Sequence, residues 1–383
     1  MKSIYWVFVL AIVGFGAGWW YLMTPTPAPQ APASLLREEV QSTTAATTTD
    51  TEMPNLPRVS VVAENLHIPW EILFLPDGEM LVTERPGSVV LLQSGTEIAV
   101  PGIRHIGEGG LLGAALHPDF ADNQLLYLYQ TTEDGDGLRN RIARYRLANG
   151  TLTLDRVIID ELPGARYHDG GRIAFGPDGY LYATVGDALS PNQAANSDSL
   201  EGTTIRLTAD GAIPPENPFG TAVYSYGHRN AQGLAWDVAG NLWSTEHGRS
   251  GIRSGFDEVN VIVSGGNYGW PESEGDSVAD GTVGPVRHST ADVTWAPASA
   301  AYLDGSLYFA GLRGETLYEA VLDGTEIVAW HEHLVGEYGR LRTVTVGPDN
   351  LLYVTTSNRD GRGDAPAAND DLLLRVNPDK LSR

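Results

Sequence analysis

The sequence predicts an all-β protein: a six-bladed β-propeller preceded by an N-terminal transmembrane helix or signal segment and a disordered linker. The propeller rests on two observations. First, an apolar stretch, a turn and a β-rich run recur six times between residues 74 and 356. Second, glycine makes up 44 of the 383 residues, which favours tight turns, and strong helical periodicity is absent.

The first 23 residues are predicted to be a membrane anchor or a signal segment. Residues 4–23 are uncharged and follow Lys2, and a run of this length can cross a bilayer as a helix. Trp19 and Trp20 at its outer end suit the membrane interface. We therefore expect an exported protein, periplasmic or extracellular, tethered by residues 4–23. A cleaved signal peptide is the alternative, because Ala31-Pro32-Ala33 resembles a cleavage site.

Residues 24–57 are expected to be an extended linker. They are rich in Pro, Thr and Ala and contain too little apolar surface to fold. The propeller domain is then expected to cover residues 58–383.

Each of the six repeats contains a turn that can be used as a marker. Pro-Asp-Gly is typical of such turns, because Pro presets φ, Asp caps the turn and Gly accepts a positive φ. The marker residues lie about 54 residues apart on average, which leaves room for four short strands per repeat. A large β-sandwich or two smaller β domains would be the alternatives. The markers are Pro76, Pro118, Pro177, Asp237, Asp304 and Pro348.

The composition excludes several classes of function. Lys and Arg number 25 and Asp and Glu 48, so the net charge of −23 makes a nucleic-acid partner unfavourable. The absence of cysteine excludes disulfides, thiolate zinc sites, iron–sulfur clusters and cysteine nucleophiles. The sequence also has no P-loop, no Gly-x-Ser-x-Gly elbow and no His-Glu-x-x-His motif.

Two residues around the third repeat could perform acid–base chemistry. His168 stands before two glycines where a loop meets a strand, and histidine is the usual general base near neutral pH. Asp187 ends the next predicted strand and could orient that histidine. The ordinary alternative is a solvated or hydrogen-bonded histidine without a catalytic role.

Arginines recur where loops enter strands. Arg229 precedes the fourth repeat together with Asn230, Arg313 lies in the fifth, and Arg340 and Arg342 precede the sixth. Because alternate residues of a strand share a face, Arg340 and Arg342 are expected to point the same way. In so acidic a protein these arginines suggest a site for a polycarboxylate, with scattered surface salt bridges as the alternative.

Acidic and glycine-rich segments follow the fourth repeat. Residues 245–249 and 265–271 flank Asp257 and Glu258. Carboxylates beside loops with free carbonyl groups suit a hard cation such as calcium, although acidic loop residues are more often merely solvated.

Taken together, these motifs resemble the soluble quinoprotein aldose sugar dehydrogenases, the glucose/sorbosone dehydrogenase family. The resemblance extends from about Leu66 to Val376, and several motifs in one order make it specific. The motifs occupy residues 67–71, 107–113, 117–120, 168–171, 227–230, 245–248, 257–258, 267–271 and 339–342. The resemblance implies a six-bladed propeller that uses pyrroloquinoline quinone (PQQ) and Ca²⁺.

The resemblance also assigns roles. His168 matches the base that takes the proton of the sugar C1 hydroxyl, and Asp187 matches the aspartate that pairs with this base. Arg229 matches the arginine beside the reactive quinone carbonyl. The residues that match cofactor contacts, besides Arg229, are Glu108, Asn230, Arg313, Arg340 and Arg342. The family has glutamine at position 108 in its glucose dehydrogenase branch, so that in this chain the contact is either rearranged or made by a protonated Glu108.

Calcium ligands are implied in two places. The carbonyl groups of Gly248 and Arg249 match those that hold the catalytic ion, although the glucose dehydrogenase branch has proline in place of Arg249. The Glu258 carboxylate and the Tyr268 carbonyl match a second, structural calcium site.

The function implied is oxidation of an aldose to its lactone, with an external electron acceptor that reoxidises the cofactor. We expect a monomer or a homodimer. Two alternatives remain at this point: a non-catalytic, surface-anchored propeller that binds carbohydrate or protein, and a calcium-dependent lactonase.

Overall fold

The computed structural model describes residues 56–135, 137–251 and 254–382. The predicted membrane anchor and all of the predicted linker except residues 56 and 57 lie outside these residues. Within the described part of the chain, no helix combines the length and the apolar character that crossing a membrane requires.

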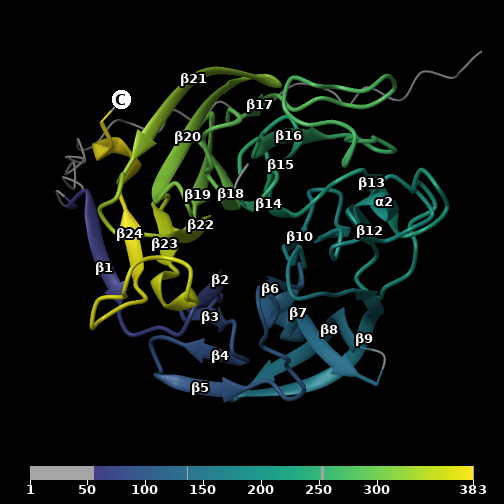
Figure 1. Ribbon diagram of the computed structural model, residues 1–383. Coiled ribbons are helices and arrows are strands. Elements are labelled where there is room, and N and C mark those ends of the chain that lie inside the picture. Colours follow the sequence, from purple (N-terminus) through teal and green to yellow (C-terminus); the bar gives the residue numbers. More distant parts are fainter. Residues whose placement is uncertain (1–55, 136, 252–253, 383) are drawn as a thin grey trace, which may run out of the picture. The chain divides into compact units, whose positions relative to one another are not determined.

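The predicted six-bladed β-propeller is confirmed. The described residues form six four-stranded antiparallel sheets (Figure 1). Each sheet contacts the next around a closed ring, at most junctions through the innermost strands. Each sheet is therefore a blade, and the ring leaves the two rims to the connecting loops.

The first three blades follow the chain directly, from the innermost strand outward. Blade 1 contains β2 (Pro69–Phe74), β3 (Met80–Glu84), β4 (Ser88–Leu91) and β5 (Thr96–Ala99). Blade 2 contains β6 (Leu111–Leu116), β7 (Leu125–Asp134), β8 (Gly137–Ala148) and β9 (Thr151–Pro163). Blade 3 contains β10 (Ile173–Phe175), β11 (Leu181–Val185), β12 (Thr203–Leu207) and β13 (Val223–Tyr226).

The next two blades repeat this order, and the last is completed from the other end of the domain. Blade 4 contains β14 (Ala231–Trp236), β15 (Leu242–Glu246), β16 (Glu258–Ile262) and β17 (Arg287–His288). Blade 5 contains β18 (Pro297–Leu303), β19 (Ser306–Gly311), β20 (Thr316–Asp323) and β21 (Glu326–His333). Blade 6 contains β22 (Leu341–Val346), β23 (Leu352–Thr356), β24 (Leu373–Val376) and β1 (Val59–Ala63).

The described helices are short and lie in connections. They are α1 (Phe120–Asn123), α2 (Pro191–Ala194) and two 3₁₀ helices at Asn358–Asp360 and Pro378–Lys380.

All six marker turns occupy the same position, between the first and second strands of a blade. The aspartates stabilise these turns as expected: the Asp77 carboxylate accepts a hydrogen bond from the Glu79 amide at 3.0 Å, and Asp237 accepts one from the Ala239 amide at 2.9 Å. The sequence repeat therefore coincides with the blade.

Blade 6 closes the ring by pairing strands from both ends of the domain. Strand β1 lies antiparallel to β24, with Val59 opposite Val376. The first β-strand of the domain is thus the outermost strand of the last blade.

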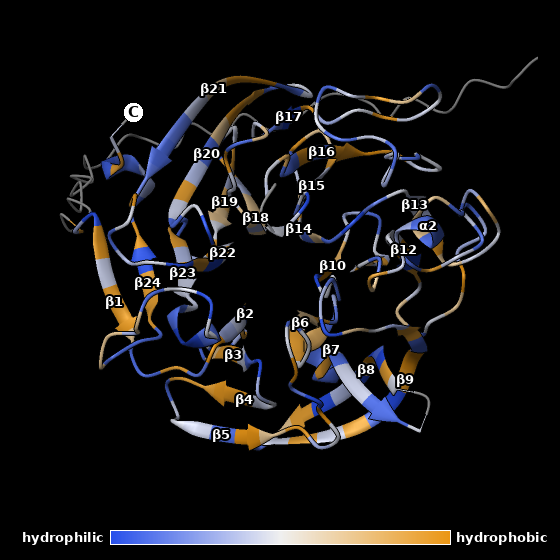
Figure 2. Cartoon of the chain, viewed as in Figure 1, coloured by the Kyte–Doolittle hydropathy of each residue, from blue (hydrophilic) through white to orange (hydrophobic). Residues whose placement is uncertain are grey.

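The core consists of apolar layers between adjacent blades. Trp70 of β2 packs with residues of blades 2 and 3, and Trp243 of β15 packs with residues of blade 5. Both indole rings are fully buried. Figure 2 shows apolar colour along strands such as β4, whereas many connecting loops are hydrophilic. The packing holds the strand ends rigidly, which positions the loop residues of each rim.

Candidate active site

The predicted catalytic residues gather at one rim, where the innermost strands begin and the second strands end. His168 lies before β10, Arg229 directly before β14 and Arg340 directly before β22, while Asp187 follows β11. Because adjacent strands of a blade are antiparallel, these two kinds of strand end meet at the same rim.

A cavity of about 380 Å³ opens at this rim. It is lined by seven of the predicted site residues: Glu108, His168, Arg229, Gly248, Arg249, Arg313 and Arg340. Asp187, Asn230, Arg342, Glu258 and Tyr268 do not line it. Its walls come from loops of several blades, so that the site exists only in the closed ring.

His168 and Asp187 form a buried pair. The His168 Nδ1 atom lies 2.7 Å from Asp187 Oδ1, and the Asp187 side chain is only 2% exposed. Asp187 accepts two further hydrogen bonds, from the Trp270 indole N–H at 2.9 Å and from the Leu189 amide at 2.9 Å. A carboxylate at Nδ1 holds the proton on that nitrogen and leaves Nε2 as the proton acceptor.

The loop around His168 is held in an unusual conformation. His168 has a φ of +64°, which is uncommon for a residue other than glycine. Gly186 packs against it so closely that a Cβ atom at position 186 would lie 1.8 Å from the His168 carbonyl oxygen. The next residue, Asp169, is buried and accepts hydrogen bonds from Asn140 and from the Ala165 amide. The backbone is thus fixed on both sides of the histidine.

Arg229 lies beside the free nitrogen of His168. Its Nη2 atom is 2.9 Å from His168 Nε2 and 2.5 Å from Ser250 Oγ. Its guanidinium carbon lies 5.5 Å from the centre of the Trp270 ring. Burial lowers the pKa of Arg229, although nearby carboxylates oppose this. A cation next to the proton acceptor can stabilise negative charge that develops on a bound oxygen atom.

A second buried group fixes the backbone of Arg229. Glu246 accepts a hydrogen bond from the Arg229 amide and another from His228 Nδ1 at 2.8 Å. The other His228 nitrogen lies 2.9 Å from Ser225 Oγ. Ser225 and His228 are fully buried and do not line the cavity, so this Ser–His–Glu arrangement supports the loop.

Glu108 accepts hydrogen bonds through both of its carboxylate oxygens. Its Oε1 atom accepts a hydrogen bond from Arg362 at 2.6 Å, and its Oε2 atom accepts one from the His168 amide at 2.9 Å. Burial raises the pKa of Glu108, but Arg362, His247 and the His168 amide together outweigh this and lower it to about 2. Asn230 bridges the same loops, since it accepts from the Gly170 amide and donates to Glu108 at 3.4 Å.

Arg340 and Arg342 are both buried but lie in different surroundings. A β-bulge between Leu341 and Thr343 interrupts the expected alternation. Arg340 lines the cavity and pairs with Asp360 at 2.8 Å. Arg342 instead donates to Gln232 at 3.1 Å, and its guanidinium carbon lies 5.8 Å from the Trp70 ring centre.

The arginines leave positive charge uncompensated in the site. Burial lowers the pKa of Arg342 to about 9, and the like charges of Arg85 and Arg340 contribute. Arg85, which belongs to none of the predicted motifs, is also buried and donates to His105 Nε2 at 3.2 Å. Within the described part of the chain, the guanidinium groups of Arg85, Arg229 and Arg342 form no ion pair with a carboxylate.

The donor set therefore fits a polycarboxylate cofactor. Among the described residues, Arg342 Nε, Arg249 Nε and His247 Nε2 are buried without a hydrogen-bond partner. Burial lowers the pKa of His247 to about 3, so its imidazole is neutral. Unpaired buried cations and unsatisfied polar atoms are unfavourable unless an anionic group with several acceptors binds to them.

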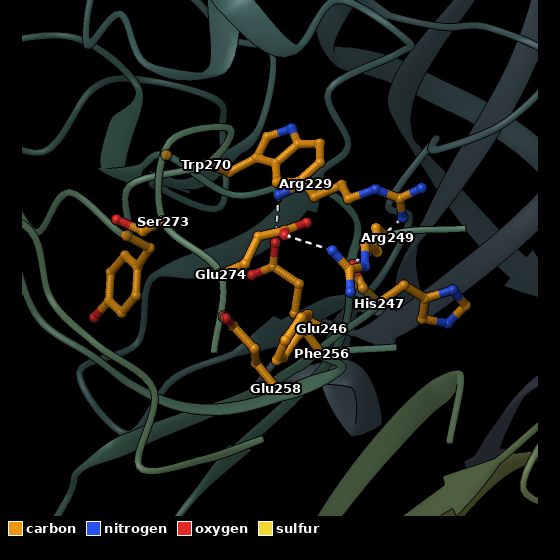
Figure 3. Close-up of a pocket in the computed structure, with 12 residues that line it drawn as sticks. Arg229, Glu246, His247, Arg249, Phe256, Glu258, Trp270, Ser273 and Glu274 are labelled. Carbon is orange, nitrogen blue, oxygen red and sulfur yellow. Dashed lines mark hydrogen bonds and ion pairs between the residues drawn. The ribbon is translucent and has the colours of Figure 1, made fainter. Parts of the chain in front are cut away.

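The predicted calcium ligands line a second, much smaller cavity of about 20 Å³, next to the first. Figure 3 shows Glu246, Glu258 and Glu274 gathered in this pocket, with Arg249 paired with Glu274 at 3.2 Å. Tyr268 and Gly248 also line it. A cavity of this size has room for one water molecule or a cation.

The carboxylates of Glu246 and Glu258 repel each other in the small cavity. Burial raises the pKa of Glu258 to about 8, and the negative charge of Glu246 contributes. In the described part of the chain, no cluster of three or more His, Asp and Glu side chains has a metal-binding arrangement. Three of the four predicted ligands (Gly248, Arg249 and Tyr268) would act through backbone carbonyl groups.

Arg85 and Arg362 were not identified from the sequence, and Glu246, His247 and Trp270 lay within the predicted motifs without a role of their own. His247 follows the second strand of blade 4 and Arg85 the second strand of blade 1, close to the position of Asp187 in blade 3. The position within the repeat was therefore a usable signal for these two residues.

Comparisons with known proteins identify the family of this chain. Residues 66–374 match the family model described as glucose/sorbosone dehydrogenase. An aldose sugar dehydrogenase of Escherichia coli (strain K12) is 31% identical, over 85% of this chain and 94% of its own length. The quinoprotein glucose dehydrogenase B of Acinetobacter calcoaceticus is 35% identical, over 56% of this chain and 52% of its own.

A solved structure extends the comparison to three dimensions. The PQQ-bound form of the aldose sugar dehydrogenase from Streptomyces coelicolor is 42% identical. It superposes with a TM-score of 0.75, over 83% of this chain and 98% of its own. This chain belongs to the glucose/sorbosone dehydrogenase family.

Proposed function

We propose that this protein oxidises the C1 hydroxyl group of an aldose sugar to the lactone. When bound, PQQ supplies the two-electron acceptor and Ca²⁺ the Lewis acid. Family membership supports the sugar dehydrogenase activity, and the PQQ-bound relative supports the cofactor. The observation that carries the proposal is the Asp187–His168 pair, whose histidine lies beside Arg229 at a cavity that Arg249, Arg313, Arg340 and Arg362 also line.

His168 would act as the general base. Its Nε2 atom accepts a hydrogen bond from Arg229 in this structure, and the sugar hydroxyl replaces that donor when it binds. Nε2 then takes the hydroxyl proton, and the Asp187 carboxylate stabilises the imidazolium that forms. Arg229 remains close enough to stabilise negative charge on the substrate oxygen.

The remaining predicted residues would bind the cofactor and the cations. Arg340 and Arg342 would bind carboxylate groups, with Arg313 at the exposed side of the cavity. The carbonyl groups of Gly248 and Arg249 would hold the catalytic Ca²⁺. Glu258 and the Tyr268 carbonyl would hold a second, structural Ca²⁺.

The arginine cluster favours this function over the two alternatives considered. A lactonase needs a cation and a base but has no use for several buried arginines. A propeller that only binds carbohydrate or protein has no need of a His–Asp pair beside a charged cavity.

The test is spectroscopic. The purified full-length protein is mixed with Ca²⁺ and PQQ, and the quinone absorption is recorded before and after addition of glucose or another aldose. We expect binding followed by sugar-dependent reduction. His168→Ala should slow the reduction by ~10²–10⁴ with an unchanged melting temperature. Folded protein that binds no PQQ would refute the proposal.

The export of the protein and its tether at residues 4–23 stay proposals, as do an external electron acceptor and a monomeric or homodimeric state. Fractionation of cells that express the full chain tests the first two. Release of the protein from membranes by salt alone would contradict a membrane-spanning anchor.

A further inference from the structure

The ion pair between Glu108 and Arg362 joins two distant parts of the ring. Glu108 lies in the connection that leads to blade 2, and Arg362 lies between β23 and β24 of blade 6. The atoms Arg362 Nη1 and Glu108 Oε1 are 2.6 Å apart, and both residues line the large cavity. The side chain of Glu108 is 12% exposed and that of Arg362 is 39% exposed.

Glu108 cannot easily leave the cavity wall, because it is held by other contacts. Its Oε2 atom accepts hydrogen bonds from the His168 amide and from Asn230. The carboxylate therefore helps to hold the backbone of the proposed base. Its negative charge nevertheless faces the site proposed for a polycarboxylate, where it opposes binding of an anion.

Arg362 is positioned to cancel that charge. The Asp360 carboxylate pairs with Arg340 and also accepts a hydrogen bond from the Arg362 amide at 2.9 Å. A Cβ atom on Gly363 would lie 2.6 Å from Cδ of Arg340, so the segment 360–363 packs directly onto this arginine. The Arg362 guanidinium carbon also lies 5.2 Å from the Tyr167 ring centre. The segment 360–363 thus orients two arginines: Arg340 pairs with Asp360, and Arg362 pairs with Glu108.

We propose that Arg362 is a cofactor-affinity residue that acts by neutralising Glu108. The pair keeps the hydrogen bonds of Glu108 to the loop of His168 while removing its net charge from the cavity. The guanidinium group of Arg229, which lines the cavity and forms no ion pair with a described carboxylate, then remains an uncompensated charge that an anionic cofactor meets. This inference rests on the proposed function, and it explains how a glutamate is tolerated at this position.

A double-mutant cycle tests the proposal. The dissociation constant of PQQ is measured in the presence of Ca²⁺ for the wild type, Arg362→Ala, Glu108→Gln and the double variant, by equilibrium titration of the quinone absorption. Arg362→Ala leaves a bare carboxylate in the cavity and should weaken binding by ~10–100-fold. Glu108→Gln keeps an acceptor oxygen for the His168 amide and should bind PQQ within about threefold of the wild type or more tightly.

The double variant decides the mechanism. If Arg362 acts only through Glu108, then Glu108→Gln should restore the affinity of Arg362→Ala to within about threefold of the wild type. A double variant as weak as Arg362→Ala would overturn the proposal, as would an Arg362→Ala protein with wild-type affinity. Arg362→Lys keeps the charge and should lose less than about fivefold.

Two controls separate other causes. Arg156→Ala removes one positive charge from a half-exposed ion pair with Asp210 on the outer strand β9, and should leave PQQ affinity unchanged. If the wild type itself fails to bind PQQ, the proposed function fails. If the wild type binds PQQ and the effects of the two substitutions on PQQ affinity simply add, only the role of Arg362 is refuted.

Discussion

Replacement of Asp187 by Asn tests the proposed acid–base machinery most directly. The three groups that contact the Asp187 carboxylate are His168 Nδ1, the Trp270 indole N–H and the Leu189 amide. His168 Nδ1 and the Leu189 amide share Oδ1, and the Trp270 indole donates to Oδ2, so the single oxygen of an asparagine can serve only one of the two sides. With its oxygen towards the indole, its NH₂ group faces His168 Nδ1, which becomes an acceptor, and the imidazole proton moves to Nε2. In that tautomer Nε2 cannot take a proton from the substrate.

The size of the effect follows from the geometry. When His168 becomes an imidazolium, its charge lies 2.7 Å from a carboxylate that is 2% exposed. Coulomb's law with an effective dielectric constant of about 20 gives about 6 kcal/mol for unit charges at this distance. Each ~1.4 kcal/mol corresponds to a factor of ten in rate, so the loss is at most about 10⁴-fold. We expect Asp187→Asn to slow the chemical step by ~10³–10⁴.

The assay is the single-turnover reduction of PQQ by glucose, or by the aldose that the wild type oxidises best, followed by stopped-flow absorption at pH 7. Asp198→Asn, an exposed residue in the loop that follows Asp187, is the matched control and should react like the wild type. PQQ affinity is measured in parallel, because Asp187 does not line the cavity and its loss should leave binding within a few-fold. An Asp187→Asn protein that reacts within tenfold of the wild type would refute the reasoning.

Three further predictions concern buried charges. Arg342→Met removes a buried cation whose Nε atom has no hydrogen-bond partner. The cofactor-free protein should therefore keep its melting temperature within about 2 °C, while PQQ affinity falls at least about tenfold. A large drop in melting temperature would contradict this. Burial raises the pKa of Asp169 to about 7, so the native state keeps a proton that the unfolded chain releases near pH 4. The free energy of unfolding should therefore fall by up to ~4 kcal/mol as the pH rises from about 4 to about 7. Asp169→Asn should reduce that fall, measured by urea unfolding at pH 5 and pH 8. An unchanged pH dependence would exclude Asp169 as its cause. Calcium should raise the melting temperature of the wild type more than that of Glu258→Gln, and equal increases would argue against Glu258 as a ligand.

The blades could be predicted because each is specified locally. Turns such as Pro76-Asp77-Gly78 mark the first hairpin of a blade, and the β-rich runs beside them are its strands. The placement of β1 in blade 6 was not predicted, because nothing in residues 59–63 indicates pairing with a strand more than 300 residues away. Ring closure is a property of the whole chain.

The site was predictable where a residue has a fixed place at a strand end or in a family motif, as for His168 and Asp187. Contacts between connecting loops were not. Glu108 and Arg362 are separated by 254 residues, and no local sequence pattern around either residue indicates the other as its partner. The difference between Arg340 and Arg342 also escaped prediction, because the bulge that separates their surroundings leaves no sign in the residue types.

The pairing of β1 with β24 has a consequence for how the protein folds during synthesis. Residues 59–63 leave the ribosome early, but their partner at residues 373–376 follows only at the end of the domain. Until then β1 has no strand to pair with and remains an open edge, which is prone to pair with other chains. The contact also closes the longest loop of the domain and so contributes strongly to a high contact order. We therefore expect the sixth blade to be the slow, final step of folding, and truncations near residue 373 to leave five assembled blades with an open ring.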